Sequence, residues 1–152
     1  MLKNTFIGIL IAIFVIHISL PHHEEKKVRH HQEKHIACVV DVPDELIVAL
    51  IRVESKGDTR AVGGGGKSLG CLQLTKIYIQ EVNEIYKTNF TFNDAYNREK
   101  SIKIAKMYLG YFGGQIGRKA TLEDLARIHN GGPNGHKKSA TKKYWEKVKR
   151  EL

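Results

Sequence analysis

The pattern of apolar and polar positions divides the chain into an apolar N-terminal segment, a polar tract and a long region of helical periodicity. Residues 6–20 are almost wholly apolar, and residues 21–37 show no apolar period. Beyond residue 40, apolar side chains recur three and four positions apart, which is the spacing of one face of an α-helix. The pattern predicts an N-terminal segment, a linker and one domain, over residues 1–20, 21–40 and 41–152.

Start and stop signals place five helices in this domain. Four helices are expected to begin at residues whose side chains can cap a first turn, namely Asp41, Thr75, Asn97 and Thr121. The first should end just past Ser55 at Gly57, the third at Gly113–Gly114, and the fourth at residues 130–133; a last helix is expected over residues 141–149. Residues 56–71 are expected to form a loop, with a possible short strand at 70–74. The domain is therefore predicted to be all-α, or α+β at most.

Apolar spacing also predicts which side chains of the third helix face the core. They are Ile102, Ala105, Leu109 and Phe112. With the apolar faces of the other helices, they make a core of modest size for about 110 residues.

One carboxylate interrupts the apolar face of the first helix. Ile47, Leu50, Ile51 and Glu54 lie at positions i, i+3, i+4 and i+7 and so share one face. Burial of an unpaired charge is costly, so a carboxyl group there tends to keep its proton. A protonated carboxyl group is what glycoside cleavage needs at the leaving oxygen. The alternative is a glutamate at a helix end that turns into solvent, and the pattern alone leaves both open.

The N-terminal apolar segment suggests export or membrane tethering. Residues 6–20 follow Lys3 and fit a signal peptide or a short membrane anchor. The segment is shorter than the ~20 residues of a spanning helix. No Ala-x-Ala cleavage signal follows it, so an uncleaved anchor stays open. We expect a periplasmic or extracellular protein, or one anchored in the membrane and facing the cell wall.

The cysteine and histidine residues do not indicate a metal site or a cofactor. Cys38 and Cys71 could form one disulfide in an exported protein, and otherwise are small core residues. The histidines in residues 21–37 match no closed zinc site in their spacing. We therefore expect no metal and no cofactor, and interpret the tract as a solvated linker.

The domain is basic. The formal net charge is +9, and the segment after residue 40 carries 20 basic and 13 acidic residues. Seven basic residues lie near the C-terminus: Lys137, Lys138, Lys142, Lys143, Lys147, Lys149 and Arg150. Such charge suits an anionic polymer, whether cell wall, nucleic acid or a membrane surface. Aromatic residues are few and no nucleic-acid motif is present, so no nucleic-acid partner is expected; the C-terminal cluster alone is interpreted as a solvated helix face.

Three segments, in this order and spacing, resemble the lysozyme-like superfamily. They are Glu54-Ser55 at a helix end, the turn Gly70-Cys71-Leu72-Gln73, and Ala126-Arg127-Ile128-His129-Asn130-Gly131-Gly132-Pro133. The first half is similar to lytic transglycosylases. The second half is similar to invertebrate-type lysozymes, whose pattern continues here in residues 141–148. The resemblance covers about residues 42–149 and implies a small helical lysozyme-like domain after the N-terminal hydrophobic segment.

The resemblance also implies a substrate and roles for five residues. The substrate would be the β-1,4 bond between N-acetylmuramic acid and N-acetylglucosamine in peptidoglycan glycan strands. Glu54 matches the catalytic acid, Gln73 the glutamine that lines the sugar groove, and Asn130 the asparagine that contacts an N-acetyl sugar. His129 takes the position usually held by tyrosine in transglycosylases. Ser55 matches the serine after the acid, and its hydroxyl is expected to hydrogen-bond nearby backbone or substrate. Taken singly, Gln73 is also typical of a surface turn, Asn130 of a helix stop and His129 of a packed histidine.

A second carboxylate is absent from its expected position. Invertebrate-type lysozymes supply one about ten residues before the glutamine, which here is Gly63, and the nearest acid is Asp58. Hydrolysis ordinarily uses two carboxylates. This departure favours a lytic transglycosylase, in which Glu54 acts as acid and then as base and the product carries a 1,6-anhydro end. The alternatives are a lysozyme-type hydrolase and a wall-binding module without turnover. With residues 6–20 as a membrane tether, an envelope machine or a phage particle would suit such an enzyme.

Overall fold

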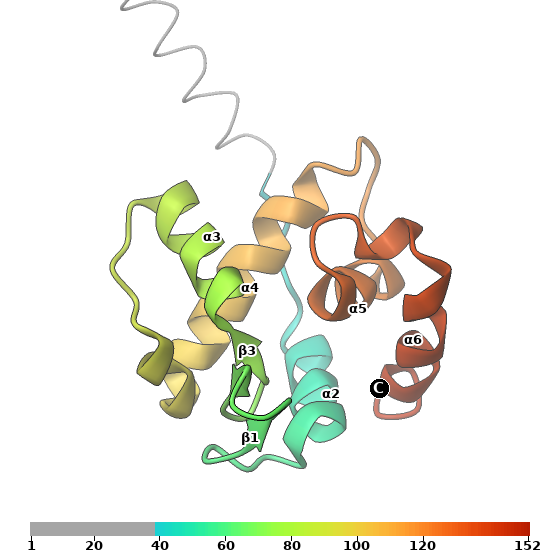
Figure 1. Ribbon diagram of the computed structural model, residues 1–152. Helices are drawn as coiled ribbons and strands as arrows, with labels where there is room; N and C mark the ends of the chain where they lie inside the picture. Colours follow the sequence, from blue (N-terminus) through green and yellow to red (C-terminus); the bar gives the residue numbers. More distant parts are fainter. Residues whose placement is uncertain (1–38) are drawn as a thin grey trace, which may run out of the picture.

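Five α-helices and a small antiparallel sheet make up residues 39–152, the part of the chain that the computed structural model describes (Figure 1). The helices are α2 (Asp44–Ser55), α3 (Lys76–Tyr86), α4 (Arg98–Gly114), α5 (Leu122–Gly131) and α6 (Lys142–Val148). Three short 3-10 helices connect them: η1 (Phe92–Tyr96), η2 (Gly135–Lys137) and η3 (Ser139–Thr141). The predicted all-α fold with at most a minor β part is confirmed.

Several expectations from the sequence lie outside the described residues. They concern the apolar segment 6–20, the histidine-rich tract and Cys38. Within residues 39–152, no helix is both long and apolar enough to cross a membrane. Cys71, the other cysteine, is fully buried.

Helix α2 starts later than predicted. Asp41 does not cap it; the N-cap is Pro43, with an extended backbone at φ −60° and ψ 143°. Proline disfavours a helical conformation in the residue before it, so the helix does not continue back through Val42. The segment before the helix lies against α4, where the Val40 amide donates to the Gly110 carbonyl at 3.0 Å. At its other end α2 stops at Ser55, as predicted.

The other predicted helix starts are confirmed. Thr75 accepts a hydrogen bond from the Tyr78 amide, and Asn97 accepts one from the Lys100 amide. Thr121 caps α5 with a full capping box. These caps stabilise helix starts because they satisfy backbone donors that have no partner within the helix.

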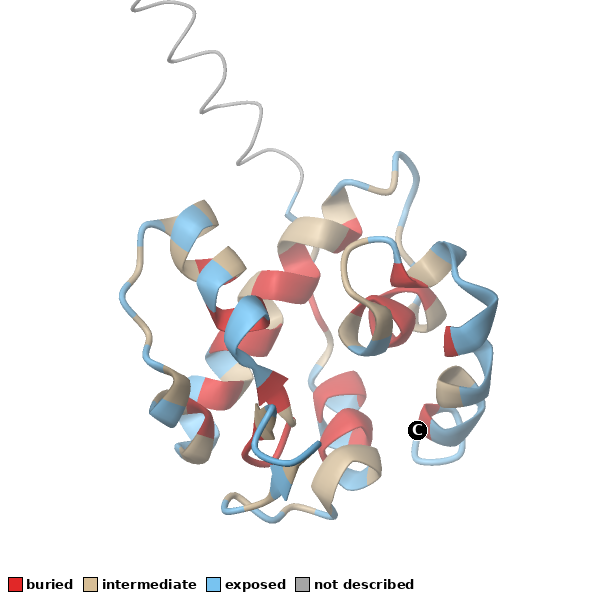
Figure 2. Cartoon of the chain, viewed as in Figure 1, coloured by how far each residue is buried: buried red, intermediate tan, exposed pale blue. Residues whose placement is uncertain are grey.

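Helix α4 lies centrally and packs against α2, α3 and α5. Its most buried residues are Ser101, Ile104, Ala105, Tyr108, Leu109, Gly110 and Gly113. Of the predicted inward positions, Ala105 and Leu109 are fully buried, and Ile102 and Phe112 are half buried and pack against the core, so the predicted face is confirmed. Because α4 has neighbours on several sides, its buried residues also include Ile104 and Tyr108. Figure 2 shows buried segments along this helix.

The glycine-rich segment 56–71, which was predicted as a loop, contributes two strands of a three-stranded sheet, and the third strand begins at Leu74, the last residue of the short strand predicted at 70–74. Its strands are β1 (Val62–Gly63), β2 (Ser68–Leu69) and β3 (Leu74–Thr75), and both pairings are antiparallel. Gly70, between β2 and β3, has φ +76°, and a Cβ there would overlap the Ala95 carbonyl oxygen. Only glycine fits this turn, which holds the sheet against η1 and next to the end of α2.

Candidate active site

A pocket of about 390 Å³ lies where α2, the sheet, α3, α4 and α5 meet. Four of the five residues predicted from the sequence line it: Glu54, Gln73, His129 and Asn130. The sequence places these residues up to 76 positions apart, at the end of α2, before β3 and at the end of α5. The fold thus brings the three predicted segments into one site.

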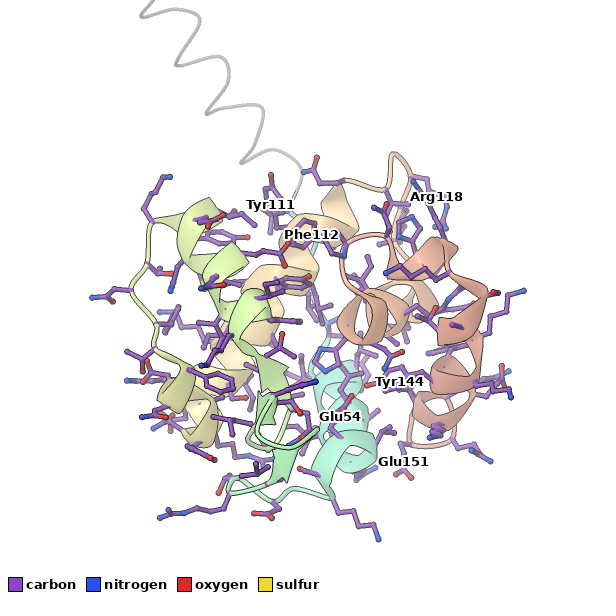
Figure 3. The ribbon with its side chains drawn as sticks, viewed as in Figure 1. Glu54, Tyr111, Phe112, Arg118, Tyr144 and Glu151 are labelled. Atoms are coloured by element: carbon purple, nitrogen blue, oxygen red, sulfur yellow. The ribbon has the colours of Figure 1, made fainter. Side chains whose placement is uncertain are left out.

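Glu54 lies in the last turn of α2 with its side chain 19% exposed. The Tyr144 hydroxyl donates a hydrogen bond to Glu54 Oε1 at 2.7 Å. Figure 3 shows the two side chains reaching towards each other from α2 and α6. Burial, and next the charge of Glu54, raise the pKa of Tyr144 far above its usual range. Tyr144 therefore keeps its proton and acts as a permanent donor to the carboxylate.

His129 packs beside Glu54 as a buried histidine. Its side chain is 4% exposed, and its Nε2 lies 3.7 Å from Glu54 Oε1. Its Nδ1 lies 3.3 Å from the Tyr78 hydroxyl. Burial lowers the pKa of His129, although the Glu54 charge and a hydrogen bond with the Leu72 backbone oppose this shift. The imidazole is therefore mainly neutral at neutral pH and does not form a full ion pair with Glu54.

We expect His129→Gln to lower the Tm, and the Tm difference between wild type and variant to become smaller at acidic pH. Because the pKa of His129 is lowered in the folded state, the unfolded chain binds this proton more strongly, near the ordinary value of 6.5. The stability due to neutral His129 is present above that pH and is lost as the pH falls below it. The Tm advantage of the wild type over the variant should shrink between about pH 8 and about pH 5. Melting curves at several pH values measure it, and a gap that stays constant would contradict the prediction.

Gln73 is held in place by its own turn. Its backbone is left-handed at φ +48°, an uncommon conformation for a residue with a side chain. Its Nε2 donates to the Gly70 carbonyl at 2.9 Å, and its Oε1 accepts from the Ser68 hydroxyl at 2.8 Å. Backbone strain of this kind persists where the surroundings hold it, often at binding sites. The amide group is thus fixed at the wall of the pocket.

Ser55 does not line the pocket. Its hydroxyl donates to the Cys71 carbonyl at 2.9 Å and accepts from the Gly57 amide at 3.2 Å. These bonds tie the end of α2 to the turn that carries Gln73. Of the two expected partners of the Ser55 hydroxyl, the backbone contact is present, and the contact with substrate stays a prediction.

Asn130 sits at the exposed end of α5, on the rim of the pocket. Within the described residues its side chain makes no hydrogen bond. Gly132, the next lining residue, has φ +79° and ends the helix. An amide group held at a helix end without a protein partner can bond to a ligand's acetamido or hydroxyl groups.

The pocket contains one carboxylate among its lining residues, that of Glu54. Asp58 is exposed and lies outside the pocket, where its Oδ1 accepts from the Arg60 amide at 2.8 Å. Gly63 does line the pocket, but a Cβ there would overlap Gln73 Oε1 and lie 2.6 Å from Ser68 Oγ. An acid at position 63 would therefore have to displace the Gln73 and Ser68 side chains from their hydrogen bond.

Some lining residues were missed from the sequence. Tyr78 and Tyr108 stack with their ring centroids 3.6 Å apart, and the Tyr108 hydroxyl donates to Glu81 at 3.0 Å. Neither tyrosine was singled out from the sequence. Tyr144, which contacts Glu54 without lining the pocket, lies in the predicted last helix and in the segment 141–148 that continues the invertebrate-type pattern, but no role was predicted for it.

Comparisons with known proteins show which family the chain belongs to. The Transglycosylase SLT domain family matches residues 33–151. A protein named lysozyme from Ostrea edulis is 29% identical over 120 residues, which cover 76% of this chain and 86% of that protein. A lysozyme from Magallana gigas is 46% identical over 43 residues, covering 28% of this chain and 31% of that protein.

A solved structure shows the same fold. It is a chain of the crystal structure of Aeromonas hydrophila PliI in complex with Meretrix lusoria lysozyme, with a TM-score of 0.63 and 22% identity. The match covers 72% of this chain and 89% of that chain. Together, the family match over most of the chain and the shared fold confirm the resemblance to the lysozyme-like superfamily: the chain belongs to the Transglycosylase SLT domain family and is an enzyme that acts on peptidoglycan.

Proposed function

We propose that the chain is a peptidoglycan lytic transglycosylase in which Glu54 is the single acid and base. The observation that carries the proposal is the lone carboxylate of the pocket, together with the occupied space beside Gly63. Hydrolysis with inversion or retention ordinarily requires two carboxylates on either side of the bond. An intramolecular attack needs only one, because the nucleophile belongs to the substrate.

In the first step, the protonated Glu54 carboxyl group gives its proton to the oxygen between muramic acid C1 and N-acetylglucosamine C4. The C1–O bond breaks, and its electron pair stays on the departing N-acetylglucosamine oxygen. The acetamido oxygen of muramic acid stabilises the positive charge that develops at C1. Tyr144 holds Glu54 Oε1 at 2.7 Å and so restricts the rotation of the carboxyl group.

In the second step, the Glu54 carboxylate takes the proton of the muramic C6 hydroxyl. The C6 oxygen then attacks C1 and closes a 1,6-anhydro ring. Glu54 regains its proton, no water is consumed, and the atoms balance. We assign Gln73 and Asn130 to contacts with the sugar acetamido and hydroxyl groups, and Ser55 to positioning the end of α2.

The products of sacculus digestion test this proposal. We expect mass analysis to find muropeptides with 1,6-anhydro ends, each lighter by one water than a reducing-end fragment. Digestion in water enriched in heavy oxygen should leave these ends unlabelled. Reducing ends that carry the heavy oxygen would overturn the transglycosylase and show hydrolysis.

The similarity to the proteins named lysozyme from Ostrea edulis and Magallana gigas favours a lysozyme-type hydrolase as the second candidate. On the same pocket, Glu54 would protonate the leaving oxygen and then activate a water at C1. The labelling experiment separates the two. For either activity we propose a wall-facing location, supported by the apolar residues 6–20 and the position of peptidoglycan outside the cell membrane.

A further inference from the structure

Six exposed basic side chains cover the outer side of α6 and the segment that leads into it. They are Lys138, Lys142, Lys143, Lys147, Lys149 and Arg150, here called the basic face. Figure 2 colours most of this region as exposed. Only one acidic residue, Glu146, lies among them. Within residues 39–152, none of the six forms an ion pair with a carboxylate.

Helix stability accounts for only part of this arrangement: Glu146 lies four positions after Lys142, and Lys147 lies in the last turn, where the helix dipole favours a cation. Lys143 and Lys147 lie four positions apart on α6, where like charges repel and destabilise a helix. The first turn of α6 holds Lys142 and Lys143 and no acidic residue, although the helix dipole disfavours cations at that end. A local conflict with stability of this kind is expected where a surface has a function.

The basic face begins at the rim of the pocket. Lys138 Nζ donates to the carbonyl of Gly131, whose neighbours Asn130 and Gly132 line the pocket. On α6 itself, Tyr144 reaches inward to Glu54 from between the exposed lysines. Helix α5, whose end lines the pocket, packs against both η2 and α6. The pocket rim and the basic face are therefore connected through the same helix.

We propose that the basic face binds the carboxylates of the peptide stems that peptidoglycan strands carry, while the glycan lies in the pocket. This inference rests on the proposed function, because it assumes a peptidoglycan strand at Glu54. An extended stem of five residues spans about 16 Å. Since the seven residues of α6 make a helix about 10 Å long, a stem that leaves its sugar at the rim can lie along all of it.

The surroundings favour carboxylates over nucleic acid as the partner. Proteins that hold single strands combine basic grooves with aromatic rings on which bases stack. The aromatic residues of α6, Tyr144 and Trp145, are half buried in the packing of the domain. The basic face therefore offers charge without stacking surfaces, which fits flexible acidic peptides.

Binding to intact and peptide-free peptidoglycan tests the proposal. The parent protein is the full chain with Glu54→Gln, so that binding is measured without turnover. The test variant adds Lys142→Gln, Lys143→Gln and Lys147→Gln, all at exposed positions. We expect about tenfold weaker co-sedimentation with intact peptidoglycan at low salt, and unchanged binding to glycan from which an amidase has removed the stems. The parent should also lose affinity for intact material as salt rises.

A matched control removes the same charge elsewhere. It carries Arg60→Gln, Lys87→Gln and Arg98→Gln, three exposed positions on other elements that form no ion pair within residues 39–152. This control should bind intact peptidoglycan like the parent. An equal loss in control and test variants would overturn the proposal in favour of net charge alone.

Other outcomes also overturn the proposal. One is equal binding of the parent to intact and stripped glycan. Another is binding of the parent to duplex DNA that is tighter than to intact peptidoglycan and is lost in the test variant, which would assign the face to nucleic acid. A reducing-end product from the wild type would instead overturn only the transglycosylase chemistry, because the binding comparison does not depend on the product.

Discussion

Glu54→Gln is expected to reduce peptidoglycan cleavage by about 10³-fold or more, because no other carboxylate in the pocket can transfer a proton. Glutamine has nearly the same shape and keeps a carbonyl oxygen that can accept the Tyr144 hydrogen bond. The fold and the Tm should therefore change little. Release of soluble muropeptides from purified sacculi gives the rate, and thermal melting gives the stability.

Glu81→Gln is the matched control for this substitution. Glu81 is also a half-buried carboxylate that accepts a tyrosine hydroxyl, that of Tyr108 at 3.0 Å, but it does not line the pocket. The same chemical change there should leave cleavage near the wild-type rate. Turnover retained by Glu54→Gln would remove Glu54 from the mechanism, and inactivity of both variants would point to a general structural effect.

Tyr144→Phe is expected to lower kcat by about 10- to 100-fold, since a hydrogen bond to a charged group contributes about 1.5–3 kcal/mol. The variant loses only the hydroxyl that donates to Glu54 Oε1 at 2.7 Å, while the ring keeps its packing. Tyr144 does not line the pocket, so KM should stay close to the wild-type value. Steady-state kinetics on a soluble glycan fragment separate the two constants.

Tyr86→Phe removes a comparable hydroxyl far from the reaction. The Tyr86 hydroxyl donates to the Met107 carbonyl at 3.0 Å, and Tyr86 does not line the pocket. A purely structural role for Tyr144 predicts that both variants lose stability and neither loses kcat. A fall in kcat confined to Tyr144→Phe is the signature of positioning at Glu54.

The helix starts and the place of Glu54 could be predicted because they depend on neighbouring residues. Thr75, Asn97 and Thr121 cap helices through side-chain bonds that span three positions. Asp41 failed as a cap because Pro43 stops the helix from continuing back through Val42, and the segment before the helix contacts α4. The loop prediction for the glycine-rich segment missed the sheet, since strands of two residues leave no periodic pattern to detect.

The grouping of Glu54, Gln73, His129 and Asn130 came from the resemblance of three short motifs to the lysozyme-like superfamily, and the fold places all four in one pocket. Two features of the site could not be found in this way. The donor to Glu54 comes from Tyr144, 90 positions along the chain, and Ser55 turns to the Cys71 carbonyl instead of the pocket.

The sequence by itself determined where α3, α4 and α5 begin and where α2 ends, and that one carboxylate would close an apolar helix face. Those features follow from backbone hydrogen bonding and periodicity within a few residues. The tertiary structure alone decided which oxygen of Glu54 is held, what fills the space beside Gly63, and that the basic face starts at the pocket rim. These depend on contacts between helices and turns distant in sequence, and packing in three dimensions sets their geometry.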